Sequence, residues 1–284
     1  MHNLSVECRP ENEFRTNRMD NLKGTIRPMN QKLATLWLGA FFALAWLPFG
    51  QLPFMEDHWM KIGAYIAPFL LFMAFKARAS SQSDGPLMTD SFVVACALAA
   101  AYLVHQVEEH WVDLLGRPYP LYELLNSLIA QAFGEEKYGV MTPRALFYVN
   151  AGTVWTLAFT AILASPKHVF PAVAMAGLMI VNGAAHIVVA GAQTSYNPGL
   201  ATSIVLFLPL ALAFYRALLG AHGATPIMLG AGIAYGVVGH VLLFAGLFAA
   251  NVFGLIPISL YYTILIVYGL LPLALFRSQA AVAA

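Results

Sequence analysis

Charged residues are scarce in this chain. Only 10% of its 284 residues are Asp, Glu, Lys or Arg, whereas 60% are hydrophobic. A soluble domain is about 25% charged and about 45–50% apolar, so this composition excludes an ordinary soluble fold. The formal net charge of +1 is too small to indicate a basic surface for nucleic acid. We therefore expect a membrane protein with no nucleic-acid partner.

Two further features are missing. The chain has two cysteines, Cys8 in a polar stretch and Cys96 in an apolar one, so no disulfide framework is expected. The N-terminal residues are polar and basic, and no short apolar core follows a brief basic start, which argues against a cleavable signal peptide. We expect residues 1–31 to form a disordered cytoplasmic tail.

Long apolar runs fill the rest of the sequence. A helix needs about 20 residues to cross a hydrocarbon core of about 30 Å. Residues 32–284 are therefore expected to form a single all-α domain, a polytopic bundle of transmembrane helices. About eight spans are predicted, at residues 33–52, 59–77, 89–113, 144–165, 168–192, 198–219, 226–250 and 254–276.

The distribution of Lys and Arg predicts the orientation of the bundle. With the N-terminus inside, the 15 basic residues divide into eleven on the inner side and four on the outer side, as the positive-inside rule requires. An even number of spans returns Arg277 to the inside. The sequence predicts an N-in, C-in, multi-pass protein of the cell membrane, either a plasma membrane or a bacterial inner membrane.

One segment between the predicted spans is amphipathic. Leu121, Leu124, Leu125 and Leu128 recur at helical spacing, which predicts a short amphipathic helix in the membrane interface near residues 120–133. Because this helix follows the polar end of the 89–113 span, it could act as a lid. The alternative is a loop that rests on the bilayer.

A dense polar motif ends the apolar run of residues 89–113. It reads His105-Gln-Val-Glu108-Glu109, and positions i, i+3 and i+4 share one face of a helix. Ionisable groups inside a membrane are costly, usually face the protein interior and mark functional sites. His110, five residues after His105, is expected to face elsewhere and to have an interfacial role.

Two other spans bring polar residues to the same depth. At a rise of about 1.5 Å per residue, Asn150 and His186 both lie outward of the middle of their spans. Asn182 lies one turn below His186 on the same face. Polar groups from three spans are therefore expected in one layer of the membrane.

His240 is a further candidate, near the middle of the 226–250 span. Gly232, Gly236 and His240 are spaced by four residues, and small residues at this spacing let helices approach closely. The pattern points His240 toward a neighbouring helix, either as a ligand or as a hydrogen-bonded packing residue.

The motif suits a metal centre. In the inverted zincin motif, His-x-x-Glu-His, the outer pair binds zinc and the inner Glu is the general base. Two His and one carboxylate with an open position form a catalytic zinc arrangement. We expect a divalent metal, with zinc favoured and iron as the alternative. The predicted metal ligands are His105, Glu109, His186 and His240. The predicted catalytic residues are Glu108 as base, with Asn150 and Asn182 to orient ligands or polarise a substrate carbonyl. The other interpretation is a buried polar network that only ties the helices together.

Four motifs in order resemble a known family of polytopic membrane proteins, the family with the His-x-x-Glu-Glu (HXXEE) motif. The resemblance covers roughly residues 90–215 and implies a shared site without giving a reaction. His240 lies outside it. The matching residues are His105-Gln-Val-Glu108-Glu109, Asn150 in Tyr-Val-Asn-Ala, Asn182-x-x-x-His186, and Tyr196-Asn-Pro198-Gly199 with Thr202.

Three functions fit these residues. The first is a metal-dependent membrane hydrolase that acts on a lipid or other small apolar substrate from the outer half of the bilayer, with membrane lipids as its surroundings. The second is a non-haem iron oxidoreductase, although paired iron in helical bundles draws on more carboxylates. The third is a proton-coupled small-molecule transporter, although the chain lacks the repeated halves that many carriers show.

Overall fold

The computed structural model describes residues 31–81, 85–165, 167–220 and 224–276. The predicted cytoplasmic tail lies outside them except for Gln31, as does Cys8, whereas Cys96 is a buried free thiol. Contacts within the chain divide it into two units, residues 1–38 and 39–284. The described part of the first unit is the beginning of one helix, and all other elements belong to the second.

The described residues are helical and contain no β-strand, which confirms the predicted all-α membrane fold. In chain order the elements are α2 (Gln31–Phe49), α3 (Pro53–Ser80), η1 (Leu87–Thr89), α4 (Ser91–His110), α5 (Pro120–Phe133), η2 (Glu135–Lys137), α6 (Pro143–Phe147), η3 (Tyr148–Trp155), α7 (Thr156–Ala164), α8 (Phe170–Gln193), α9 (Leu200–Thr202), η4 (Ser203–Phe207), α10 (Leu208–Leu219), α11 (Pro226–Leu247), η5 (Phe248–Val252), α12 (Ile258–Leu270) and η6 (Leu271–Leu273).

Six helices among the described residues are long and apolar enough to cross a membrane. They are Pro53–Ser80, Ser91–His110, Pro143–Ala164, Phe170–Gln193, Leu200–Leu219 and Pro226–Val252. A shorter apolar helix, Ile258–Leu273, follows them, and α2 precedes them. These helices fall where the sequence predicts spans, whereas the count of eight and the N-in, C-in orientation stay predictions.

Three of the long helices contain a π-helical stretch. The stretches are η3, η4 and η5. Such wide turns are rare in proteins, and many of those that do occur lie at functional sites. Here η3 carries Asn150, and η4 begins directly after Thr202.

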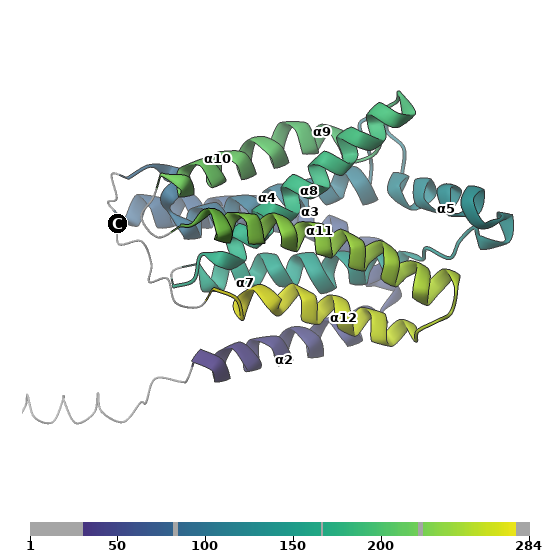
Figure 1. Ribbon diagram of the computed structural model, residues 1–284, viewed down its shortest axis with the longest axis horizontal. Helices are drawn as coiled ribbons and strands as arrows, with labels where there is room; N and C mark the ends of the chain where they lie inside the picture. Colours follow the sequence, from purple (N-terminus) through teal and green to yellow (C-terminus); the bar gives the residue numbers. More distant parts are fainter. Residues whose placement is uncertain (1–30, 82–84, 166, 221–223, 277–284) are drawn as a thin grey trace, which may run out of the picture. The chain divides into compact units, whose positions relative to one another are not determined.

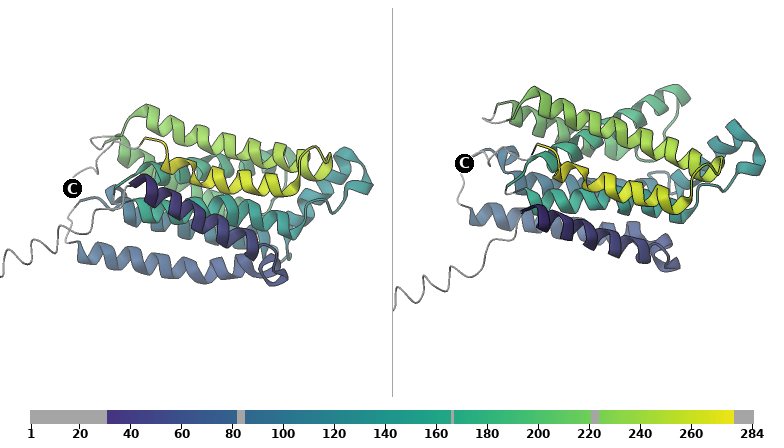
Figure 2. Two further views of the ribbon diagram at one scale, coloured as in Figure 1. Left: turned by 90° about the horizontal axis from the view of Figure 1, so that it is seen from below. Right: turned by 60° about the horizontal axis from the view of Figure 1, so that its bottom comes forward.

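Helix α4 lies in the core of residues 39–284 (Figures 1 and 2). It begins at Ser91, and the preceding residue, Asp90, caps it by accepting hydrogen bonds from two backbone N–H groups of the first turn. It packs against α3, α7 and α8 and is buried along nearly its whole length. By contrast, α3 exposes large apolar side chains, including Tyr65 and Phe75, as a helix that faces lipid does.

The predicted amphipathic helix is present as α5, at one end of the bundle (Figure 1). The side chain of Asn126 fixes the segment that follows it. Its Oδ1 accepts from the N–H groups of Gly139 and Met141 at 3.0 and 3.1 Å, and its Nδ2 donates to the carbonyl of Met141 at 3.0 Å. This pairing holds residues 139–141 against α5 and so fixes where the next helix begins.

Helices α8 and α11 cross at glycines, as the spacing of Gly232 and Gly236 predicts. A Cβ atom at Gly177 on α8 would lie 2.0 Å from the carbonyl oxygen of Gly232. A Cβ atom at Gly236 would lie 2.6 Å from the carbonyl oxygen of Gly177. The two backbones are therefore in direct contact, which only glycine allows. Beyond this contact, toward α5, the two helices diverge (Figure 1).

Candidate functional site

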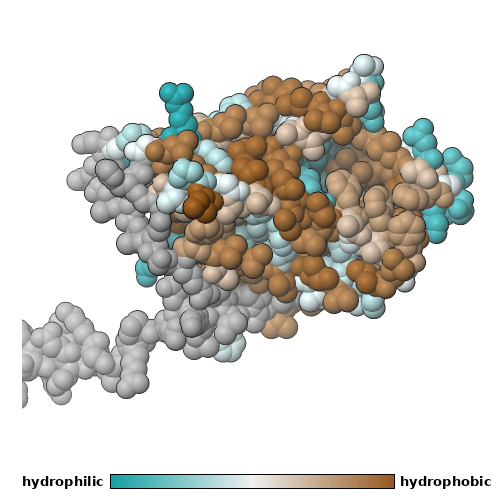
Figure 3. Space-filling model, viewed as in Figure 1, coloured by the Kyte–Doolittle hydropathy of each residue, from teal (hydrophilic) through white to brown (hydrophobic). Residues whose placement is uncertain are grey.

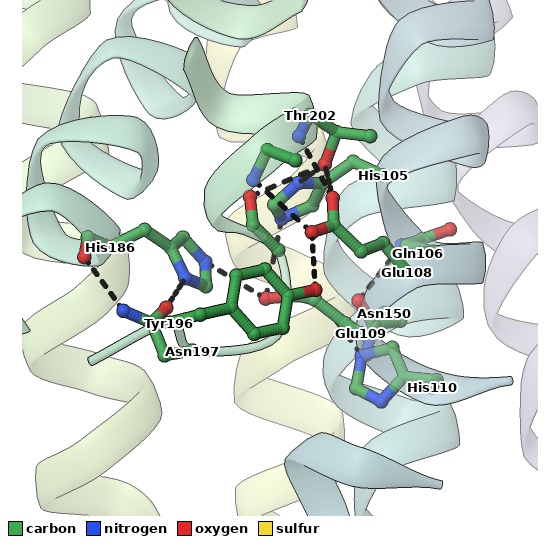
Figure 4. Close-up of polar contacts among 12 residues, drawn as sticks. His105, Gln106, Glu108, Glu109, His110, Asn150, His186, Tyr196, Asn197 and Thr202 are labelled. Carbon is green, nitrogen blue, oxygen red and sulfur yellow. Dashed lines mark hydrogen bonds and ion pairs between the residues drawn. The ribbon is translucent and has the colours of Figure 1, made fainter. Parts of the chain in front are cut away.

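Two imidazoles and one carboxylate meet in the second half of α4. Glu109 Oε1 lies 3.2 Å from His105 Nε2 on the same helix and 3.0 Å from His186 Nε2 on α8. One ligand-type atom from each of the three residues lies within 4.8 Å of the others. His105 is fully buried and Glu109 is 5% exposed. The structure thus brings together His105, Glu109 and His186, at the shared depth expected from the sequence (Figure 4).

The hydrogen bonds of His105 fix where its proton lies. Thr202 Oγ1 lies 2.5 Å from Glu108 Oε2 and 2.7 Å from His105 Nδ1. A hydroxyl carries one proton, and it donates to the carboxylate, so the hydroxyl oxygen accepts from His105 Nδ1–H. In the neutral ring, the lone pair is then on Nε2, the atom that faces Glu109.

His186 is held in the same way. The backbone turns sharply after α8 at Thr194, with φ of 50°, and returns Asn197 to the ring. Asn197 Nδ2 donates to the carbonyl of His186 at 2.9 Å, so Asn197 Oδ1 accepts from His186 Nδ1 at 2.7 Å. The lone pair of a neutral His186 is therefore also on Nε2, 3.0 Å from Glu109 Oε1.

Gly199 closes the site from the side of the 194–199 loop. Its φ is +89°, and a Cβ atom there would lie 2.7 Å from His186 Cε1 and 2.8 Å from His105 Cε1. The backbone therefore passes directly against both rings, and only glycine fits.

Glu108 points to the beginning of the 200–219 helix. Its carboxylate accepts hydrogen bonds from the N–H groups of Ala201 at 3.1 Å and Thr202 at 2.8 Å, and from the hydroxyls of Thr202 and Tyr196 at 2.5 and 2.7 Å. Burial and the adjacent Glu108 raise the pKa of Tyr196, so this phenol stays a donor at neutral pH. An anion at a helix N-terminus is stabilising. This arrangement favours a positioning role for Glu108. The role of general base, which the sequence predicts, stays a prediction.

His110 is the clearest difference from the sequence-based expectation. It is 3% exposed, and its Nε2 lies 3.4 Å from Glu109 Oε2. The expectation that it faces elsewhere is therefore wrong. The helix ends at His110, and the ring lies beside the buried Trp59, with centroids 5.0 Å apart, so the side chain fills space inside the protein.

A chain of amides orients His110. Trp155 Nε1 donates to Gln106 Oε1, and Gln106 Nε2 donates to Asn150 Oδ1, both at 2.8 Å. Asn150 Nδ2 then faces His110 Nε2 at 3.2 Å and can only donate. Asn150 thus holds a site residue, as the sequence suggested, but that residue is His110 rather than a predicted ligand.

A cavity of about 260 Å³ opens beside Glu109 and His186. Leucines of α5 form one of its walls, namely Leu121, Leu124, Leu125 and Leu128. Asn182 and His240 lie on another wall, formed by α8 and α11. Figure 3 shows this face of the molecule, hollowed between α8 and α11 beside α5, with hydrophilic residues in the hollow and hydrophobic ones around it.

The structure does not bring His240 into the His105–Glu109–His186 cluster. Its Nδ1 lies 2.8 Å from the carbonyl of Gly236, one turn back on α11, and therefore donates to it. Asn182 is not among the three residues of the cluster, and no described residue donates a hydrogen bond to its buried Oδ1. Both residues line the cavity instead.

The residues that the sequence reasoning left without a role form the second layer of the site. They are Gln106, His110, Tyr196, Asn197, Gly199 and Thr202. A signal for the last four was present, because they stand in the motif of the family that the chain resembles. The hydrogen-bond partners are separated by up to 97 residues, and no spacing rule connects them.

Comparison with known proteins agrees with the four motifs. Residues 96–214 match the family described as "Protein of unknown function with HXXEE motif". No curated protein and no solved structure matches the chain. The matched region runs from the middle of α4 to α10 and contains both clustered imidazoles and both adjacent carboxylates, whereas His240 lies outside it. Over residues 96–214, this multi-pass membrane protein therefore matches the HXXEE family.

Proposed function

We propose that this protein is a metal-dependent enzyme of the cell membrane, a hydrolase that acts on a lipid or other apolar substrate. The observation that carries the proposal is the convergence of His105 Nε2, Glu109 Oε1 and His186 Nε2. In neutral imidazoles all three atoms are lone-pair donors, so a cation between them relieves a repulsion that the fold otherwise imposes.

The separations support this donor set. In a tetrahedral zinc site with bonds of about 2.0–2.1 Å, neighbouring ligand atoms are about 3.3 Å apart. The distances from Glu109 Oε1 to the two nitrogens are 3.2 and 3.0 Å. Both imidazoles also donate their other N–H to an oxygen, as ligating histidines almost always do.

A bound zinc ion would supply a Lewis acid and a water molecule that is easily deprotonated. The chain's own residues have separate tasks. Thr202 and Asn197 hold the two imidazoles with Nε2 facing Glu109, and Glu108 holds Thr202 in turn. The leucines of α5 exclude water from the cavity beside the site. These tasks suit hydrolysis of an apolar substrate, which needs a dry cavity next to a polar centre.

Iron is the second candidate. Two His and one carboxylate with open positions are also the ligand set of non-haem iron oxygenases, so the same three residues suit an oxidoreductase. The identity of the metal separates the two functions, because zinc favours hydrolysis and iron favours oxidation.

Elemental analysis of the purified full-length protein, prepared without chelator, tests the proposal. We expect the wild type to carry zinc or iron, and we expect His105→Ala, Glu109→Gln and His186→Ala to lose it. Glu108→Gln should keep the metal, and its turnover, once a substrate is found, decides between the base and positioning roles. His168→Ala is the matched control, because His168 is a buried imidazole 3.2 Å from the carbonyl of Pro272, outside the site.

A wild type without metal, or equal metal content in all these variants, would overturn the enzyme proposal. The transporter would then become the better explanation of intramembrane His and Glu.

A further inference from the structure

The walls of the cavity beside Glu109 carry almost no charge. Among the described residues that line it, none is Lys or Arg, and Glu109 is the one carboxylate. Phosphate and carboxylate head groups are recognised by Arg, Lys or helix N-termini. The N-terminus nearest to the site, at residues 201–202, is already occupied by Glu108. When no metal is bound, an anionic lipid head would therefore find no Lys, Arg or free helix N-terminus on these walls.

The size of the cavity limits its occupant further. Its volume is about 260 Å³, slightly below the range of about 300–1,000 Å³ for sites that enclose a drug-sized ligand. A lipid with two acyl chains would leave most of both chains outside it. The leucines of α5, which present four side chains to the cavity, form an apolar wall for part of one chain.

Two polar side chains, Asn182 and His240, lie on the α8–α11 wall. Each has one acceptor atom to which no described residue donates a hydrogen bond. The Oδ1 atom of Asn182 is buried and accepts no hydrogen bond from the residues that the structure describes. His240 uses Nδ1–H for the carbonyl of Gly236, which leaves Nε2 of the neutral ring as an acceptor. A buried acceptor without a donor is costly, so this wall favours a ligand that brings hydrogen-bond donors of its own.

The hollow between α8 and α11 gives such a ligand a path (Figure 3). Its rim is apolar, and side chains next to it on both helices are exposed, including Val188 on α8 and Val241 on α11. Exposed valines on a spanning helix face lipid. A molecule dissolved in the bilayer can thus reach the cavity sideways without crossing water.

We propose that the cavity binds an uncharged single-chain lipid whose hydroxyl or amide head group lies between Asn182 and His240 and whose chain lies along the leucines of α5. This inference names the substrate class of the proposed hydrolase and therefore rests on the proposed function. It assigns His240 to substrate recognition, whereas the sequence suggested metal ligation.

The test compares two lipids with the same acyl chain and different heads. The full-length protein in detergent micelles is freed of metal with a chelator and then titrated with 1-monooleoylglycerol or with oleoyl lysophosphatidic acid, and binding is followed as the shift in thermal unfolding midpoint. We expect the monoacylglycerol to bind at least about 10-fold more tightly. Asn182→Leu and His240→Phe, which keep the size of the side chains, should each weaken its binding by about 3- to 10-fold, the effect of one hydrogen bond.

The controls are Val188→Leu and Val241→Leu, which lie on the same two helices and face lipid. They should bind the monoacylglycerol as the wild type does. Equal binding of the two lipids, tighter binding of the lysophosphatidate, or unchanged binding by the Asn182 and His240 variants would overturn the inference.

Metal analysis of the same preparations before chelation distinguishes this inference from the proposed function. If the protein carries metal but does not discriminate between the lipids, the substrate class is wrong and the metal enzyme stands. If it discriminates between them without carrying metal, the cavity binds the lipid class as proposed and the hydrolase is wrong.

Discussion

Two adjacent carboxylates on α4 lie in opposite surroundings. Glu108 faces four hydrogen-bond donors from residues 196–202, all within 3.1 Å. Glu109 faces His105, His186 and His110. The hydrogen bonds of Thr202 and Asn197 turn the lone pairs of neutral His105 and His186 toward it, whereas His110 Nε2 accepts from Asn150. On a helix the two side chains project about 100° apart, which is enough to place them in separate regions.

The comparison shows that burial alone does not reveal a function. Both residues are at most 5% exposed, and both are conspicuous in the sequence. The Glu108 region is complete as it stands, because each carboxylate oxygen has its donors. The Glu109 region is complete only if a cation or additional protons lie between its acceptors. The first region ties α4 to the 200–219 helix, and the second is where chemistry is expected.

The largest predicted loss of stability comes from removing the carboxylate of Glu108, which has all of its hydrogen-bond donors. Glu108→Ala leaves two N–H groups and two hydroxyls without their acceptor, and we expect it to lower the free energy of unfolding by about 3 kcal/mol. Metal-free Glu109→Gln should stay within about 1 kcal/mol of the wild type, because its amide can donate to His186 Nε2. Equilibrium unfolding in mixed micelles measures both. Equal losses of unfolding free energy in the two variants would mean that Glu108 and Glu109 contribute to stability in the same way.

The next largest effect is a loss of metal affinity when the residues that orient the two imidazoles are changed. Thr202→Val and Asn197→Leu each remove the acceptor of one Nδ1–H group, and such changes typically cost about 10- to 100-fold in metal affinity. Competition with a chelator of known affinity gives the value. Ser203→Ala is the matched control. The buried Oγ of Ser203 has no hydrogen-bond partner in the described part of the chain, so its loss should leave metal affinity unchanged. An equal loss in Ser203→Ala would point to general loosening of the site.

Tyr196→Phe tests the edge of the Glu108 region. It removes one donor from a carboxylate that keeps three others, and we expect a loss of about 1 kcal/mol in the free energy of unfolding. The metal content should be unchanged, because Tyr196 contacts Glu108 and not the Glu109 cluster. A loss of metal in this variant would show that the two regions act as one.

The smallest predicted effect on stability comes from Asp113, a third carboxylate that follows Glu108 and Glu109 in the sequence. Burial of Asp113 by itself raises its pKa, but hydrogen bonds and the charge of Arg117 outweigh burial, so that the pKa lies below its ordinary value. A lowered pKa stabilises the fold above the unfolded-state value of about 3.9, and the gain is lost as the pH falls through the folded-state value.

Because Arg117 is half exposed, the gain should be less than about 1 kcal/mol. Thermal unfolding of the wild type and Asp113→Asn between pH 3 and 7 measures it, and the two curves should converge at the acid end. A difference that grows toward low pH would contradict this assignment.

Local spacing was enough to predict the centre of the site. His105 and Glu109 follow from i, i+4 geometry, and His186 follows from its depth in a span of known rise. The amphipathic α5 and the glycine contact of α11 follow from periodicity in the same way. Each of these predictions uses only residues of one helix and the thickness of a bilayer.

What the sequence could not predict depends on contacts between distant segments. The side chain of His110 turns inward because the helix ends there and Asn150, 40 residues later, meets its ring. Thr202 reaches His105 across 97 residues only after the 194–199 loop has folded back through Gly199. The π-helical turn around Asn150 changes the helical register without any marker residue. Such features arise when helices pack, and periodicity within one helix does not contain them.

The glycine contact between α8 and α11 also has a mechanical consequence. Gly177 contacts the backbone of Gly232 with no side chain between them. If one helix tilts relative to the other, this contact is the expected pivot. His186 lies nine residues further along α8, a lever arm of about 14 Å at 1.5 Å per residue. A tilt of about 5° therefore moves His186 by about 1 Å, comparable to the small helix shifts that alter sites in other proteins. A rotation about this contact therefore displaces the end of α8 that carries His186 much more than it displaces Gly177 itself.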